Sequence, residues 1–110
     1  MKTHENITPR QEALAERNLS VALASLETPE EVRAFLRDLC TPAEIQAMAD
    51  RWAVVEALKR SLPYREVHRL TGVSITTIGR VARFLTGGHG GYDTAQRRLE
   101  AARSHAHANG

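Results

Sequence analysis

Apolar residues recur along the chain at the spacing of one face of an α-helix. The clearest stripe consists of Val32, Phe35, Leu36 and Leu39. A second stripe consists of Ile45, Met48, Trp52 and Val55, and a looser one before both consists of Leu14, Val21 and Leu26. This pattern predicts three helices, of which the first reaches about Ser25 and the third about Arg60.

Each of these three predicted helices begins with nearly the same four residues. The segments are Thr8-Pro9-Arg10-Gln11, Thr28-Pro29-Glu30-Glu31 and Thr41-Pro42-Ala43-Glu44. A threonine N-cap accepts an unpaired backbone N–H, proline suits the first helical position, and the Glu or Gln side chain reaches back to the N–H of the cap. Only Cys40 and Thr41 separate the second helix from the third. We expect so tight a corner to leave apolar faces that a partner subunit covers.

Two shorter helices are predicted within residues 62–86. Pro63 opens the first, which runs to Leu70, and Ser74 caps the second. Gly72 lies in the turn between them, where a left-handed backbone is favourable only for glycine. The residues expected to be buried between the two helices are Val67, Thr71, Val73, Ile78 and Val81, and the inner face of the second helix is expected to carry Ile75, Ile78, Val81 and Leu85. Two short helices joined by such a turn form a helix-turn-helix. His68 departs from that pattern, because a small residue, usually alanine, occupies this position.

The chain after residue 86 is interrupted by the run Gly87-Gly88-His89-Gly90-Gly91. Asp93 with Gln96 offers a weak cap for a short helix around Leu99, and residues 104–110 are expected to form a frayed tail. The 110 residues are therefore predicted to form one all-α domain. In it, residues 8–60 form a helical dimerisation scaffold, 62–86 the helix-turn-helix, and 87–110 a Gly-rich loop, a short helix and a flexible tail.

The net charge of +2 conceals an uneven distribution of charge along the chain. Residues 51–85 hold seven basic and two acidic side chains, a local net charge of +5, whereas residues 1–50 carry −4. The basic segment coincides with the predicted helix-turn-helix. This coincidence points to a polyanionic partner, double-stranded DNA.

Several classes of protein are excluded by the composition. One cysteine, Cys40, cannot form an intramolecular disulfide framework or a Cys-based zinc site. No apolar run approaches the roughly 20 residues of a membrane span, so we expect a soluble, cytoplasmic protein without a membrane partner. No carboxylate pair or Ser/His/Asp set suggests catalysis, and no His spacing matches a defined metal site. We expect neither an enzyme nor a metalloprotein.

The outer face of the second short helix carries the strongest candidates for binding DNA. Thr76, Arg80 and Arg83 are spaced i, i+4, i+7 and share one face, which suits a helix laid in the major groove. A glycine inside a helix, Gly79, is unfavourable by about 1 kcal/mol relative to alanine and indicates the close approach of a DNA backbone or a ligand. The candidate DNA-binding residues are Arg65, His68, Arg69, Ser74, Ile75, Thr76, Thr77, Gly79, Arg80 and Arg83.

An alternative function of a different class stays open. The same helices could form a dimer that acts as a protein–protein interaction module without direct DNA binding. The basic hairpin would then be a docking face for a partner protein.

Several motifs between residues 39 and 85 match one known family. They are Thr41-Pro42-Ala43-Glu44, Ala49-Asp50-Arg51, Val54-Val55-Glu56-Ala57-Leu58, Arg65-Glu66-Val67 and Ile75-Thr76-Thr77-Ile78-Gly79-Arg80. With them the chain resembles the tryptophan (Trp) repressor family, and Gly90-Gly91-Tyr92 is similar to the Gly-Tyr ending of a Gly-rich stretch in the Trp-repressor-like bacterial branch. The resemblance implies an intertwined, all-helical homodimer that binds DNA as a transcriptional regulator, and specifically as a repressor.

The resemblance also implies a small-molecule site. In the Trp repressor, tryptophan is held by two arginines and a threonine, and the matching residues here are Thr41, Arg51 and Arg80. Val81 stands where the family has a glycine that makes room for indole, and Phe84 stands where a serine receives the amine of the ligand. A tryptophan pocket would be filled and would lack one polar contact. We therefore expect a different effector or none, with the arginines bracing the dimer or binding phosphate.

Overall fold

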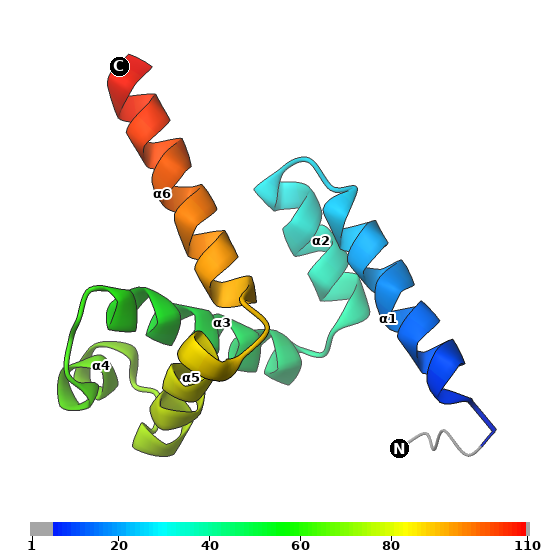
Figure 1. Cartoon of the computed structure of the whole chain (residues 1–110), viewed down its shortest axis with the longest axis horizontal. Helices are drawn as coiled ribbons and strands as arrows, with labels where there is room; N and C mark the ends of the chain where they lie inside the picture. The colour runs from blue at the N-terminus through cyan, green and yellow to red at the C-terminus, as the bar shows by residue number, and fades with distance from the viewer. Residues whose placement is uncertain (1–5, 110) are drawn as a thin grey trace. The chain divides into compact units, whose positions relative to one another are not determined.

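The structure, a computed structural model, describes residues 6–109 of the chain. Its helices are α1 (Pro9–Ala24), α2 (Pro29–Leu39), α3 (Pro42–Lys59), α4 (Tyr64–Thr71), α5 (Ile75–Gly87) and α6 (Gly91–Asn109) (Figure 1). The described residues contain no strand, which confirms the all-α prediction. Within this range, no helix combines the length and apolar character needed to cross a lipid bilayer. The chain divides into two compact units, one ending at Pro42 and one beginning at Ala43, and each is described by itself.

The first unit contains α1 and α2, and both helices begin at the predicted threonine caps. Thr8 Oγ1 accepts the backbone N–H of Gln11 at 3.1 Å, and Gln11 Oε1 accepts the backbone N–H of Thr8 at 2.8 Å. Thr28 Oγ1 likewise accepts the N–H of Glu31 at 3.1 Å. The Glu31 carboxylate, however, accepts the N–H of Glu27 at 2.8 Å, one residue before the cap. The side chain of Glu31 therefore reaches back to Glu27 and not, as predicted, to the N–H of the Thr28 cap.

The apolar residues of α1 and α2 remain largely accessible. Neither helix contains a buried residue. Leu14 and Val21 on α1 are 57% and 56% exposed, and Leu39 on α2 is 53% exposed. Two short helices bury too little apolar surface to form a core of their own. Exposed apolar stripes of this kind are typical of helices that pack against another subunit.

The core of the second unit holds the helix-turn-helix. Its buried residues come from α3, α4, α5 and the turn before α5, and they are Val54, Val55, Ala57, Val67, Val73, Ile78 and Val81. Partly buried side chains pack around them, namely Trp52, Leu58, Leu62, Leu85 and Tyr92. All of these side chains are apolar or aromatic, and the described residues include no buried polar or charged residue. The hairpin of α4 and α5 is therefore positioned by hydrophobic packing with α3.

Two glycines shape the connection between α5 and α6, and an aspartate then ties the start of α6 to α3. A Cβ atom at Gly88 would collide with the carbonyl oxygen of Phe84, and Gly90 has φ +83°. Both positions therefore favour glycine, one for space and one for backbone conformation. Asp93 then bridges two helices, since its carboxylate lies 3.0 Å from Lys59 Nζ of α3 and 3.0 Å from Arg97 Nε of α6.

α6 differs from its prediction in both its start and its length. Asp93 is not an N-cap but lies in the first turn of a helix that already begins at Gly91. The predicted short helix is also wrong, because α6 spans 19 residues to Asn109, while the predicted flexibility of the tail stays a prediction. Alanine and arginine are the commonest residues of this segment, and both have high helix propensity. From residue 97 to residue 106 every side chain is exposed, so local propensity rather than packing within the chain favours this part of the helix.

Candidate nucleic-acid interface

The turn between α4 and α5 has the predicted conformation. Gly72 ends α4 with φ +73°, in the left-handed region. Thr71 Oγ1 donates to the carbonyl oxygen of Val67 at 2.7 Å and accepts the N–H of Val73 at 3.1 Å. Val67 and Val73 are both buried. The turn is therefore held by its own hydrogen bonds as well as by the core beneath it.

The N-terminus of α5 is capped and accessible. Ser74 Oγ accepts the backbone N–H of Thr77 at 3.2 Å, which confirms the predicted cap. The Ser74 hydroxyl also donates to Thr77 Oγ1 at 3.1 Å. Ser74, Ile75 and Thr76 are exposed, and the first turn of α5 contains no acidic residue. The remaining backbone N–H groups and the positive end of the helix dipole suit a phosphate at this position.

Most of the predicted DNA-binding residues lie on the solvent side of the hairpin. The exposed ones are Arg65, His68, Arg69, Ser74, Ile75, Thr76, Arg80 and Arg83, while Thr77 and Gly79 are half-buried. The prediction that Ile75 belongs to the inner face is wrong, because its side chain is 49% exposed. At 100° per residue, Ile75 stands about 60° around the helix from the buried Ile78 and about 120° from the buried Val81. It is the first residue of α5, and its side chain stays accessible at this end of the helix.

The arginines of this surface differ in their electrostatic partners. Arg69 Nε donates to Glu66 Oε2 at 3.1 Å, and a second nitrogen of the same guanidinium contacts Glu66 Oε1. This hydrogen bonding lowers the pKa of the Glu66 carboxyl and raises the pKa of Arg69. Within residues 6–109 no carboxylate forms an ion pair with Arg65, Arg80 or Arg83. The positive charge on α5 is therefore not neutralised by the chain's described residues.

Gly79 lies on the outer half of α5 and has room for a larger side chain. A Cβ atom there would meet no other atom within 4 Å. Packing within the chain thus gives no reason for a residue that disfavours the helix by about 1 kcal/mol relative to alanine. The close approach of an external molecule at Gly79 stays a prediction.

His68 makes a contact that the sequence did not indicate. Its Nδ1 lies 2.7 Å from the carbonyl oxygen of Val73, across the turn. A small side chain is expected at this position, yet the imidazole is exposed and reaches along the turn instead. In the sequence, only the histidine at a position that usually holds a small residue indicated that this part of the turn is unusual.

The three predicted ligand-binding residues come from different segments. Thr41 precedes α3 and belongs to the first unit, whereas Arg51 on α3 and Arg80 on α5 belong to the second. Arg51 is half-buried and Arg80 is exposed. Val81, which stands where the resemblance expects a glycine, is only 1% exposed and forms part of the core. The effector site stays a prediction.

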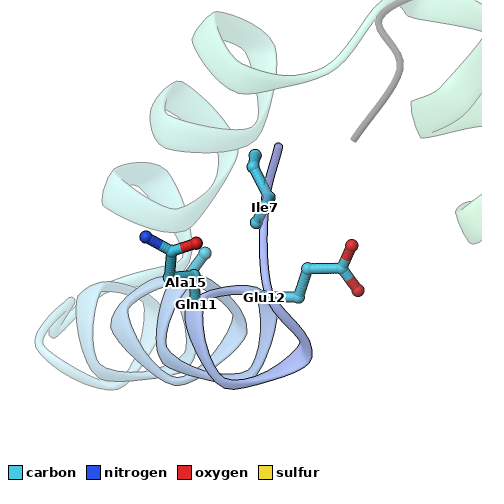
Figure 2. A pocket seen from close by; sticks show the side chains of 4 residues that line it. All are labelled: Ile7, Gln11, Glu12 and Ala15. Atoms are coloured by element: carbon cyan, nitrogen blue, oxygen red, sulfur yellow. The ribbon is translucent and has the colours of Figure 1, made fainter. Parts of the chain in front are cut away.

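A surface pocket elsewhere in the chain lies at the start of α1. Its lining residues are Ile7, Gln11, Glu12 and Ala15 (Figure 2). The amide oxygen of Gln11 already accepts the N–H of the Thr8 cap.

In the described part of the chain, no group of three or more His, Cys, Asp or Glu residues is placed to hold a metal ion.

Comparisons with known proteins agree with this geometry. The profile of the Trp repressor protein family matches residues 16–100. The uncharacterized protein YerC of Bacillus subtilis (strain 168) is 38% identical over 79 residues, which cover 72% of this chain and 76% of YerC. The crystal structure of a TrpR like protein from Eubacterium eligens ATCC 27750 is 33% identical with a TM-score of 0.70, covering 89% of this chain and 96% of that one. A crystal structure from Staphylococcus aureus is also 33% identical, with a TM-score of 0.73 over 91% of this chain and 96% of that one.

Proposed function

The chain belongs to the Trp repressor family, a family of DNA-binding regulators and not of enzymes, and we propose that it is a sequence-specific transcriptional regulator that binds DNA as a homodimer. Its role in this proposal is that of a repressor. Double-stranded DNA is the partner, and α5 is the helix that enters the major groove.

One observation carries the proposal, namely the composition of the outer face of α5. Thr76, Arg80 and Arg83 share this face, are all exposed, and lie opposite the buried Ile78 and Val81. No described carboxylate neutralises the two arginines. Hydroxyl and guanidinium groups on one exposed helix face match the acceptors of guanine and of the phosphates.

The homodimer is supported by the apolar surface of α1 and α2. Their accessible leucine and valine side chains need a cover, and a second copy of the chain offers the same surface in return. A two-fold dimer would present two copies of α5 to one duplex. The preferred DNA site should then be an inverted repeat.

Selection of duplexes from a random library tests the proposal directly. We expect the wild-type chain to enrich an inverted repeat, and its affinity for that site to fall steeply as the salt concentration rises. Sedimentation of the free protein should give the mass of two chains.

Two results would contradict the proposal. If no duplex is enriched over random sequence at low salt, the chain is not a sequence-specific DNA-binding protein, and the alternative of a protein–protein interaction module gains support. If the enriched site lacks two-fold symmetry and the free protein sediments as one chain, the homodimer is wrong while DNA binding stands.

A further inference from the structure

The hydrogen bond of His68 lies at the point where α4 passes into α5. Its Nδ1 is 2.7 Å from the carbonyl oxygen of Val73. A carbonyl oxygen only accepts hydrogen bonds, so the ring nitrogen must carry the proton and donate it. This requirement selects the tautomer protonated at Nδ1 and leaves Nε2 as the second polar atom of the ring.

His68 contacts the turn with its backbone as well as its side chain. Its carbonyl oxygen accepts the N–H of Gly72 at 2.9 Å, which ends α4. Its ring then holds the carbonyl of Val73, the last residue before the Ser74 cap. One residue thus fixes both the end of α4 and the peptide group from which α5 starts. The distance of 2.7 Å is at the short end of the range for such bonds.

The neighbouring charges on α4 do not compete for the imidazole. Glu66 forms its hydrogen bonds with Arg69, one turn away from the contact between His68 and Val73. On the far side of the turn, Ser74 Oγ and Thr77 are engaged with each other. Val73 is 6% exposed, so its carbonyl belongs to a residue anchored in the core. The bond therefore links the exposed surface of α4 to a fixed point below α5.

We propose that His68 is a positioning residue for DNA recognition, which sets the direction of α5 through the Val73 carbonyl instead of contacting a phosphate itself. The inference rests on the proposed DNA-binding function. A mispositioned α5 loses the base contacts that need a defined geometry, whereas charge attraction to the phosphate backbone is less sensitive to its angle.

Two amide side chains separate the roles of the two ring nitrogens. In His68→Asn the Nδ2–H group is as many bonds from the backbone as Nδ1 of histidine and can donate to Val73. In His68→Gln the amide instead mimics Nε2 and loses the bond across the turn. His68→Ala removes both groups. Each variant is measured by its affinity for the selected duplex and for random DNA over a series of salt concentrations.

We expect His68→Asn to stay within about twofold of the wild type. His68→Gln and His68→Ala should bind the selected duplex roughly three- to tenfold more weakly, which corresponds to the loss of one net hydrogen bond. Their affinity for random DNA and their salt dependence should be unchanged. If the Gln variant binds like the wild type, or if all three variants lower the salt slope by about 1 as for a lost phosphate contact, His68 is not a positioning residue.

A second measurement needs no DNA and separates this inference from the proposed function. Hydrogen exchange of the Thr77 backbone amide, which is bonded to Ser74 Oγ, reports whether the start of α5 is held in the free protein. Protection of this amide should fall several-fold in the Gln and Ala variants and persist in the Asn variant. Equal protection in all variants overturns the inference even if the wild-type chain binds DNA. Failure of the wild type to enrich any duplex overturns the proposed function instead.

Discussion

The guanidinium carbon of Arg80 lies 5.7 Å from the centre of the Phe84 ring, one turn further along α5. A cation above an aromatic face is favourable by about 0.5–1 kcal/mol at an exposed site. The chain thus supplies an aromatic surface for one of the two arginines that the family resemblance assigns to an effector. Phe84 also replaces the polar side chain that the resemblance expects there. Arg80 is held on the outer face of α5 by a side chain of its own helix.

This contact predicts that L-tryptophan does not control the chain. The ring of Phe84 lies next to the Arg80 guanidinium, and Val81, where the resemblance expects a glycine, is buried in the core. We expect millimolar L-tryptophan to change the affinity for the selected duplex by less than about twofold, within the differences that one weak contact makes. Calorimetry of the free protein with L-tryptophan should show no binding heat. A tryptophan-dependent rise in the affinity of the wild type by clearly more than twofold would show that the prediction is wrong.

The exposed arginines of α5 predict the salt dependence of binding. Arg80→Ala and Arg83→Ala should each weaken binding and reduce the slope of log affinity against log salt by about 1, because each removes one phosphate-neutralising charge. A loss of affinity confined to one base position of the site, with the slope unchanged, would instead assign that arginine to base recognition. Fluorescence anisotropy at several salt concentrations makes the measurement, with Arg98→Ala on α6 as the control. If both variants keep the affinity and the salt dependence of the wild type, Arg80 and Arg83 do not contact DNA.

The ion pair on α4 predicts a variant that binds more tightly. Glu66 neutralises Arg69 on the same exposed surface as the other basic side chains. Glu66→Gln removes the negative charge and leaves the guanidinium available to a phosphate, so affinity should rise by roughly threefold and the salt slope should steepen. Glu56→Gln on α3 changes the net charge equally and serves as the matched control. Equal increases in affinity from the two substitutions would show that the change in net charge alone explains the effect, and that the ion pair with Arg69 has no role in it.

Gly79 predicts opposite effects on stability and on binding. Alanine favours the helix by up to about 1 kcal/mol relative to glycine, and a Cβ atom at this position meets no neighbour. Gly79→Ala should therefore raise the melting temperature of the free protein while lowering its affinity for the selected duplex. Thermal unfolding and anisotropy measure the two effects. A more stable variant with wild-type affinity would show that no DNA backbone approaches Gly79.

The bridge from α3 to α6 predicts a loss of stability in acid. A hydrogen bond and the charge of Lys59, followed by those of Arg97, lower the pKa of Asp93 below its ordinary value of 3.8. The stabilisation is therefore complete above the ordinary value and is lost as the pH falls through the lowered one. Asp93→Asn should lower the melting temperature at neutral pH, and the difference from the wild type should shrink below about pH 4. Glu100→Gln on α6 is the control, and a difference that persists unchanged at low pH would contradict this role of Asp93.

Interactions between near neighbours in the chain were predictable from the sequence. The caps at Thr8, Thr28 and Ser74 join residues three apart, so the local backbone suffices to form them. Gly72 follows from the same kind of argument, because the conformation of the turn itself favours glycine. The basic outer face of α5 was predictable as well, since helical spacing places its residues on one side once the helix is known.

Other features depend on which segments meet in the folded chain, and helical spacing alone did not predict them. Val54 stood outside the apolar stripe expected for its helix, yet both it and Val55 are buried in the core that α3 forms with α4 and α5. The bond from His68 to Val73 requires the direction that the chain takes after Gly72, and the bridge of Asp93 requires α3 and α6 to meet 34 residues apart. The capped helices and the charged face of the hairpin are thus encoded locally. The burial of Val54 and Val55, the hydrogen bond from His68 to Val73 and the ion pair between Lys59 and Asp93 follow from the tertiary structure. Each brings together groups that come within reach only when the chain folds back on itself.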